Sequence, residues 1–353
     1  MEIEARNTND LQNKVYAALQ EHGTHDTSRN GEVLRFNEPV TTILTHPLEK
    51  VNFCPVRDAN PFFHLVESMA MLAGYNSVKL MSFFASNMAS FSDDGISYNA
   101  FYGTRMRLSW EDQLSKVIET LRDTPDSRQA VINLWNPKDL WVQTVDKACN
   151  LQIIFSIVEG KLRMTTTNRS NDAIWGGVNG ANVVHFAFFM EYVCCALDIE
   201  PEKWFHFSNN LHVYTDNPKW QKLKDLGEGD MVNFNYVADN MTLFTKANQI
   251  TFDIECMQFC KALECILEGV IDPSRLIGGE GLFEFKTPFL NKVVRPMVAA
   301  FLMWKDPNYS SSEVKSYMVQ VMCTEDDWLK LEDPWLTAGY TWMKRRNFER
   351  KGK

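Results

Sequence analysis

The sequence contains no apolar run of about 18 residues, the length that a membrane-spanning helix requires. Its opening segment, MEIEARNTND, lacks the charged and then apolar pattern of a secretion signal. Basic residues are outnumbered by acidic ones, 36 to 45, and the net charge of −9 argues against a general nucleic-acid or membrane-binding surface. A small anionic substrate is not excluded, because it needs only a local pocket. We therefore expect a soluble, cytoplasmic protein with no nucleic-acid or membrane partner.

Cysteine is used sparingly, and its spacing argues against two common roles. None of the 8 cysteines forms a CxxC pair with histidines at zinc-site spacing, so we expect no metal centre. A disulfide framework would be unusual in a chain of 353 residues, which makes reduced thiols the better interpretation. With 45% apolar residues, the chain can bury a large core, as one domain or as a domain with an appendage.

The most informative stretch is a predicted β-hairpin between residues 148 and 172. Residues 151–158 form an apolar run rich in residues that favour strands, and residues 161–168 alternate as a threonine-rich return strand. The Glu-Gly pair between them supplies the turn. A hairpin brings the residues just before its first strand close to those just after its second.

The two ends of this hairpin carry reactive and charged side chains. Cys149 precedes the first strand, and Arg169, Ser170 and Asp172 follow the second. Strand pairing would place the thiol near a guanidinium, whose charge favours the thiolate. Arginine and serine together also suit a phosphate. The residues alone leave two interpretations open: a nucleophile beside an anion site, or a small buried cysteine beside a polar strand end.

Further short motifs stand in a fixed order around this hairpin. They are Asn60–Gly74, Phe101–Gly103, Asp126–Arg128 with Trp135-Asn136, Cys149, Arg169–Asp172, the glycine-rich Trp175–Asn182 and Leu211–Tyr214. In this order, and over roughly residues 25 to 220, the chain resembles thymidylate synthases and, more closely, the phage pyrimidine-nucleotide hydroxymethylases of the same superfamily. Each motif is weak alone, but the ordered set is specific.

The resemblance implies an α+β fold, in which a thymidylate-synthase-like mixed sheet is packed with helices. We expect residues 1–245 to form this catalytic domain and residues 246–353 to add a helical C-terminal extension. Helical periodicity in the extension predicts helices over Asp253–Leu267, Pro288–Lys305 and Ser312–Cys323, with Pro296 kinking or splitting the second. In the first domain, the residues predict a helix over Asn60–Gly74.

The resemblance also assigns catalytic roles. Cys149 becomes the nucleophile, Glu67 orders water and relays protons, Tyr102 assists proton removal at C5 of the base, and Asp172 lies toward the folate pterin. The alternative for Glu67 is a carboxylate at the edge of its helix's apolar stripe, and for Tyr102 an ordinary buried aromatic.

Binding roles follow in the same way. Arg169, Ser170 and Arg128 would hold the nucleotide phosphate, with Arg128 donated across a homodimer interface. Relatives carry a second arginine where Gln129 stands. A further phosphate arginine is expected near residue 29, and Arg29 is the candidate, although a solvated turn arginine is an equal alternative. His212 and Tyr214 share one side of a predicted strand over Trp204–Tyr214 and would hold the sugar hydroxyl.

The glycine-rich loop departs from the family pattern. Relatives acting on uracil place an asparagine, and those acting on cytosine an aspartate, where Gly180 stands. A glycine has no side chain with which to read a base, so Asn179 or Asn182 would have to reach the pyrimidine. The base therefore stays undecided between uracil and cytosine, and the sugar between deoxyribose and ribose.

The expected reaction is addition of the Cys149 thiolate to C6 of the pyrimidine, followed by one-carbon transfer to C5 from 5,10-methylenetetrahydrofolate. Water would then give a hydroxymethyl group, whereas hydride would give a methyl group. Three departures favour water: no tryptophan near Asn87 and Met88, Asn150 in place of a histidine, and no short apolar closing tail. A thymidylate synthase and a degenerate, non-catalytic nucleotide-binding paralogue are the alternatives.

Overall fold

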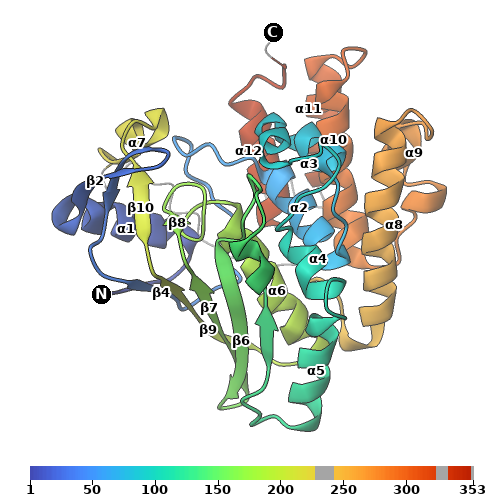
Figure 1. Ribbon diagram of the computed structural model, residues 1–353. Helices are drawn as coiled ribbons and strands as arrows, with labels where there is room; N and C mark the ends of the chain where they lie inside the picture. The colour runs from blue at the N-terminus through green and yellow to red at the C-terminus, as the bar shows by residue number, and fades with distance from the viewer. Residues whose placement is uncertain (227–241, 323–332, 351–353) are drawn as a thin grey trace. The chain divides into compact units, whose positions relative to one another are not determined.

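The structure is a computed structural model that describes residues 1–226, 242–322 and 333–350. These residues form two compact units (Figure 1). The first, which we call the sheet unit, comprises Met1–Ala59 and Asn99–Phe234. The second, the helical unit, comprises Asn60–Tyr98 and Asn235–Lys353. No helix among the described residues is both long and apolar enough to cross a membrane.

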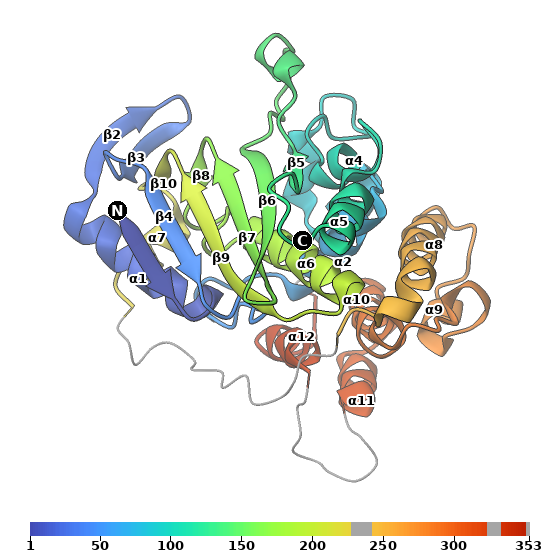
Figure 2. The same ribbon diagram turned by 90° about the horizontal axis from the view of Figure 1, so that it is seen from below.

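A six-stranded mixed sheet forms the centre of the sheet unit. The predicted hairpin is confirmed, because β6 and β7 pair antiparallel, while β7 pairs parallel with β9 (Figure 2). In order across the sheet the strands are β1 (Glu2–Ala5), β4 (Val40–Leu44), β9 (Pro201–Ser208), β7 (Lys161–Asn168), β6 (Asn150–Val158) and β5 (Val131–Asn133).

One face of this sheet is covered by helix α6 (Ala181–Leu197), as Figure 2 shows. The inward side chains alternate along the strands, and Ile153, Phe155, Met164 and Trp204 are at most 1% exposed. Helix α6 is apolar on almost every side, which suits a helix buried between the sheet and its neighbours. The α+β class predicted from the sequence is confirmed.

A second, four-stranded sheet lies in the same unit, in the order β2 (Thr24–Ser28), β3 (Gly31–Arg35), β10 (Leu211–Tyr214) and β8 (Asn171–Asp172). The prediction of one continuous strand over Trp204–Tyr214 is wrong. The chain turns at two asparagines, Asn209 and Asn210, and crosses from the first sheet to the second. Backbone hydrogen bonds to Asn168 and Asn171 fix this turn.

Helices and turns complete the sheet unit: α1 (Thr8–His22), α4 (Tyr102–Arg107), α5 (Gln113–Asp123), η2 (Pro137–Leu140) and α7 (Pro218–Leu223). Helix α1 is capped by the Asn7 side chain, which accepts the N–H groups of Asn9 and Asp10.

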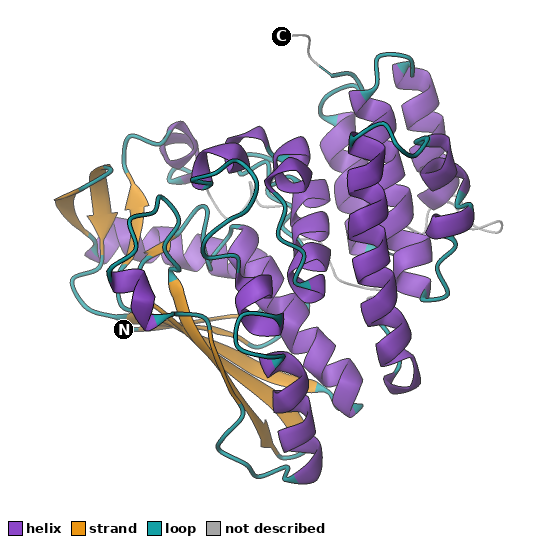
Figure 3. Ribbon diagram, turned by 45° about the vertical axis from the view of Figure 1, so that its right-hand side comes forward, coloured by secondary structure: helices purple, strands orange, loops and turns teal. Residues whose placement is uncertain are grey.

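The described residues of the helical unit contain helices and no strand (Figure 3). They are α2 (Pro61–Ala73), α3 (Val78–Phe84), η1 (Ser86–Phe91), η4 (Lys246–Asn248), α8 (Gln249–Leu267), α9 (Ser274–Gly278), η5 (Gly281–Phe283), η6 (Leu290–Val294), α10 (Arg295–Lys305), α11 (Ser311–Met322) and α12 (Pro334–Lys344). The predicted helices are confirmed, and Pro296 lies where a π turn becomes α10. The predicted end of the last one, Cys323, lies outside the described residues.

Helix α2 belongs to the same compact unit as the C-terminal helices. Its Phe62 ring lies 5.0 Å from that of Phe301 in α10 and 5.5 Å from that of Trp342 in α12, between centroids. Every residue of α2 is buried, so it needs apolar neighbours on all sides. The structural grouping therefore differs from a simple division at residue 245, and a functional division at that residue stays a prediction.

Candidate active site

The hairpin ends bring Cys149 and Arg169 together. Asn150 pairs with Asn168 in the strand register, and the Arg169 N–H donates to the Cys149 carbonyl at 2.9 Å. Ser170 follows directly, with its own N–H donated to the Asn168 side chain. The prediction that strand pairing brings Cys149 close to Arg169 and Ser170 is confirmed.

Arg169 is exposed, yet its guanidinium has a fixed position. Nε donates to the Ala148 carbonyl at 2.8 Å and Nη2 donates to the Lys147 carbonyl at 3.1 Å. The Nη1 group donates to no described residue and is available to an anion. The Ser170 hydroxyl likewise has no hydrogen-bond partner among the described residues. These two groups at the end of the hairpin are of the kind that binds an anion.

Tyr102, at the start of α4, is hydrogen-bonded to Cys149 and Asn150. We call these two residues the nucleophile segment, after the role predicted for Cys149. Its hydroxyl oxygen accepts the N–H of Cys149 (3.2 Å), the N–H of Asn150 (3.2 Å) and the Asn150 side-chain amide (3.0 Å). Burial raises the pKa of the Tyr102 phenol, and the neighbouring Cys149 adds to the rise.

Asn150 and Asn168 form a buried amide pair that the sequence analysis did not assign. The Asn168 amide donates to the Asn150 carbonyl oxygen at 3.0 Å, and Asn150 in turn donates to Tyr102. Both asparagines are at most 1% exposed. The signal was present in the sequence, since two asparagines at facing hairpin positions on the buried side need each other as partners.

The thiol is not activated by Arg169 to the extent that the sequence suggested. Burial raises the pKa of Cys149, Arg169 opposes the rise, and the carboxylates of Asp146 and Asp172 add to it. The Cys149 Sγ lies 3.9 Å from the Lys147 carbonyl oxygen, which can accept the thiol proton. Cys149 therefore rests as a thiol, because the effect of burial on its pKa outweighs that of the guanidinium.

Asp172 and His212 lie side by side in the second sheet, where β8 and β10 pair in parallel. Burial raises the pKa of the Asp172 carboxyl, opposed by the N–H groups of Ile174 and Trp175 and by His212. Burial likewise lowers the pKa of His212, opposed by Asp172. The His212 and Tyr214 rings meet at right angles with centroids 5.3 Å apart, so the predicted pair shares one side of β10.

The other two arginines that were predicted to bind phosphate are exposed in loops. Arg29 lies in the turn between β2 and β3, and its neighbour Asn30 donates to the Tyr214 hydroxyl at 3.4 Å, which places this turn beside Tyr214. Arg128 lies between α5 and β5 and pairs with no described residue.

Glu67 lies in the helical unit, on α2, and is only 4% exposed. The place where relatives carry a tryptophan falls in η1 of the same unit, with Asn87 exposed and Met88 half-buried.

The three residues of the glycine-rich loop that were considered for contact with the base have different surroundings. Asn179 is fully buried, and its amide bonds to Gln12, Asn52 and Tyr16, so it faces the interior. A Cβ on Gly180 would lie 1.8 Å from the Trp175 carbonyl oxygen, so this position accepts no side chain. Asn182 is half-buried in the first turn of α6 and bonds to no described residue.

Comparison with known proteins shows which family the chain resembles. Residues 64–228 match the model of the thymidylate synthase family. A deoxyuridylate hydroxymethyltransferase of Pseudomonas phage M6 is 35% identical over 98% of this chain and 94% of its own. One from Bacillus phage SP01 is 35% identical over 53% and 52% of the two chains. A putative thymidylate synthase of Methanosarcina acetivorans is 34% identical over 36% and 58%.

The match to the phage M6 protein covers nearly the full length of the chain, including the hairpin that carries Cys149. The phage M6 protein aligns with both the sheet unit and the helical unit, so the similarity is not confined to the hairpin. The chain belongs to the thymidylate synthase superfamily and stands within it beside the phage hydroxymethyltransferases.

Proposed function

We propose that the protein is a folate-dependent transferase that hydroxymethylates C5 of dUMP. The observation that carries this proposal is the hairpin end, where Tyr102 and Arg169 both hydrogen-bond to the backbone of Cys149. The relatives named deoxyuridylate hydroxymethyltransferases support the uracil base and the hydroxymethyl product.

Cys149 acts as the nucleophile. Its Sγ adds to C6 of the pyrimidine and makes C5 electron-rich, which the planar ring alone does not achieve. Because burial keeps the resting thiol protonated, its proton must leave as the C–S bond forms. The Lys147 carbonyl can only hold that proton, so a second group has to remove it. Glu67 is the proposed acceptor of this proton, through ordered water, whereas Tyr102, bonded to the Cys149 backbone, assists the later proton removal at C5.

The nucleotide is held at its phosphate and sugar. Arg169 Nη1 and the Ser170 hydroxyl bind the phosphate, since both are without described partners beside the thiol. His212 and Tyr214 bind the sugar hydroxyl from β10, and Arg29 reaches the phosphate from the turn next to Tyr214.

Asn182 reads the base. The Asn179 amide is already hydrogen-bonded to buried side chains, and position 180 has no room for a side chain. Asn182 has an unused amide, which can match the N3–H donor and O4 acceptor of uracil at once.

The residues present fit a folate. One Asp172 oxygen caps the Ile174 and Trp175 N–H groups, while the other accepts from no described residue and can meet pterin donors. The Trp175 ring, three residues after Asp172, is 47% exposed and offers an aromatic surface. Bound 5,10-methylenetetrahydrofolate supplies the one-carbon unit. Relatives carry a tryptophan where η1 stands in this chain, and its absence supports water, rather than hydride, as the group that completes the product.

A homodimer completes the phosphate site in this proposal. The sheet face opposite α6 carries half-exposed Ile154 and Phe205 and exposed Phe207, which a partner would cover. A cavity of about 940 Å³ borders Arg169 on this unit and is lined by Trp135 and Leu151 among others. The partner's Arg128, exposed and paired with no described residue of its own chain, would enter from that side.

The first experiment incubates the protein with methylenetetrahydrofolate and, separately, dUMP, dCMP, UMP and CMP, and weighs the products. A gain of CH2O on dUMP is the expected result. A gain of CH2 with dihydrofolate would mean a methyltransferase, and no product from a folded dimer would mean a nucleotide-binding paralogue. Cys149→Ala serves as the control and should keep binding while losing all turnover.

A second experiment tests the base-reading residue. Asn182→Asp should reverse the preference of the enzyme from dUMP toward dCMP, a change of at least about 100-fold in the ratio of kcat/KM values, because a protonated carboxyl suits cytosine. Asn179→Asp is the matched control and should lower stability without changing the preference. If Asn179→Asp alone switches the base, the assignment to Asn182 is wrong.

A further inference from the structure

The connection from Leu134 to Ala148, which leads into Cys149, has little apolar packing of its own. Trp141 is 74%, Leu140 64% and Val145 62% exposed, and in Figure 2 the segment projects beyond the ends of β5 and β6. Within its helical turn η2, Asp139 is the buried residue. A segment with this pattern takes its position from polar anchors.

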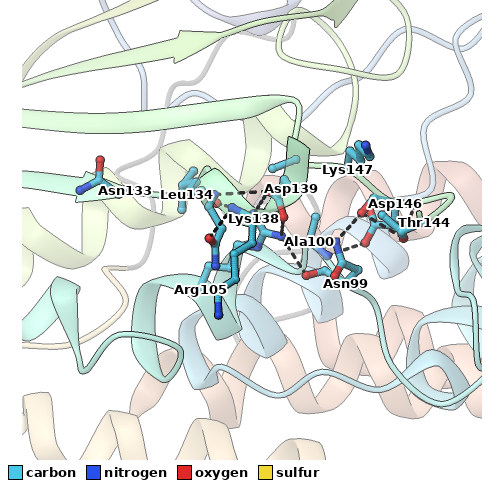
Figure 4. Close-up of polar contacts among 12 residues, drawn as sticks. Asn99, Ala100, Arg105, Asn133, Leu134, Lys138, Asp139, Thr144, Asp146 and Lys147 are labelled. Atoms are coloured by element: carbon cyan, nitrogen blue, oxygen red, sulfur yellow. Dashed lines mark hydrogen bonds and ion pairs between the residues drawn. The ribbon is translucent and has the colours of Figure 1, made fainter. Parts of the chain in front are cut away.

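The first anchor is an ion pair that no catalytic assignment includes (Figure 4). Arg105, on α4, donates to both Asp139 oxygens at 2.5 and 2.9 Å, and the two side chains are 6% and 4% exposed. The same guanidinium donates to the carbonyls of Leu134 (2.7 Å) and Asn99 (3.1 Å). Arg105 therefore holds the start of the connection, its helical turn and the segment before Tyr102.

The second anchor lies at the other end of the connection. The Ala100 N–H donates to the Asp146 carboxylate at 2.7 Å, and the Asn99 amide donates to the Asp146 carbonyl at 2.9 Å. Beyond Asp146, the carbonyls of Lys147 and Ala148 fix the Arg169 guanidinium. The connection thus lies between residues 99–105 and the nucleophile, and it also sets the direction of Arg169.

We infer that Arg105 and Asp139 are positioning residues, which hold the Cys149 thiol and the Arg169 guanidinium in register with Tyr102. This rests on the proposed role of Cys149. Neither side chain needs to touch substrate. The ion pair fixes the connection at η2, and the hydrogen bonds of Asp146 fix it near its end. The three N–H groups that donate to Tyr102 then hold Cys149 and Asn150 against α4. Loss of the ion pair frees the exposed turn and with it the thiol.

The test compares Asp139→Asn with Glu191→Gln. Glu191 forms an equally buried ion pair with Lys50 in the same unit, with both side chains 4% exposed, but it does not contact the connection. Two rates are measured: turnover of dUMP, and alkylation of Cys149 by iodoacetamide, followed by mass spectrometry of its peptide. The peptide of Cys194, 5% exposed in α6, reports unfolding of the unit in the same sample.

In Asp139→Asn we expect kcat to fall at least about tenfold while alkylation of Cys149 rises at least about threefold and that of Cys194 stays constant. Arg105→Lys should recover part of the turnover relative to Arg105→Gln, because it keeps one charged donor to Asp139. Glu191→Gln should not reproduce this pattern. Equal losses in both variants, or unchanged Cys149 alkylation in Asp139→Asn, would overturn the inference. Alkylation needs no turnover, so an inactive wild-type protein would refute the proposed function and leave this comparison valid.

Discussion

Removing the Tyr102 hydroxyl should loosen the nucleophile segment before any chemistry takes place. One buried oxygen accepts the N–H groups of Cys149 and Asn150 and the Asn150 side-chain amide, at 3.0–3.2 Å. Tyr102→Phe keeps the ring and its contact with Phe186, 5.9 Å between centroids, but leaves these donors without an acceptor. The substitution therefore isolates the hydrogen bonds from the packing.

The magnitude follows from the number of donors. A typical intramolecular hydrogen bond contributes about 1 kcal/mol net, and an unsatisfied buried donor costs about as much or more. Three lost bonds give about 3 kcal/mol, which is roughly a 100-fold increase in the population of the opened segment.

Amide hydrogen exchange measures this opening directly at Cys149 and Asn150. In Tyr102→Phe both amides should exchange roughly 100-fold faster than in the wild type, and amides in the centre of β7 should be unchanged. Tyr317→Phe is the matched control, because the buried Tyr317 hydroxyl has no hydrogen-bond partner among the described residues. Equal exchange rates in wild type and Tyr102→Phe would refute the argument that this hydroxyl holds the nucleophile segment.

Two further predictions concern the loop and the core beneath it. Gly180→Ala should cost about 3 kcal/mol or more of unfolding free energy, because its Cβ would lie 1.8 Å from the Trp175 carbonyl oxygen; a urea midpoint equal to that of wild type would contradict this. Burial lowers the pKa of His206, stacked on Trp204, to about 4, below its ordinary 6.5. Between these two pH values the unfolded chain binds a proton on His206 that the folded chain does not. The free energy of unfolding is therefore highest above pH 6.5 and falls by about 3 kcal/mol in total as the pH is lowered toward 4. In urea titrations at several pH values His206→Leu should show a shallower acid loss than wild type, and an identical slope would reject the assignment.

The sequence predicted the elements whose signals are local. The hairpin, the capped helix after Asn60 and the C-terminal helices each carry periodicity, turn residues or caps within one short window. The prediction of a single strand over Trp204–Tyr214 was wrong because the apolar pattern continues across the turn. Only the pairing of its two halves with different sheets divides the segment at Asn209 and Asn210. Likewise, no local signal places helix α2 with the C-terminal helices, since a helix buried on all sides does not indicate its neighbours.

The candidate site shows the same limit at the level of side chains. Hairpin geometry was enough to bring Cys149 to Arg169. Choosing among Asn179, Gly180 and Asn182 needed the approach of the Trp175 carbonyl and the buried partners of Asn179, which lie far away in sequence. The Arg105–Asp139 ion pair was missed for the same reason, as it joins a helix to a connection 34 residues later.

The charge state of Cys149 depends on a balance that no motif encodes. Arg169 favours the thiolate, but two of its donor groups are directed to the Ala148 and Lys147 carbonyls rather than to sulfur. Burial, with Asp146 and Asp172 nearby, then raises the thiol pKa. A phosphate bound to Arg169 would add negative charge and favour the thiol further. In the proposed mechanism, proton removal therefore accompanies attack on C6, and the hydrogen bonds of Tyr102 to the backbone of Cys149 and Asn150 keep the thiol in place for it.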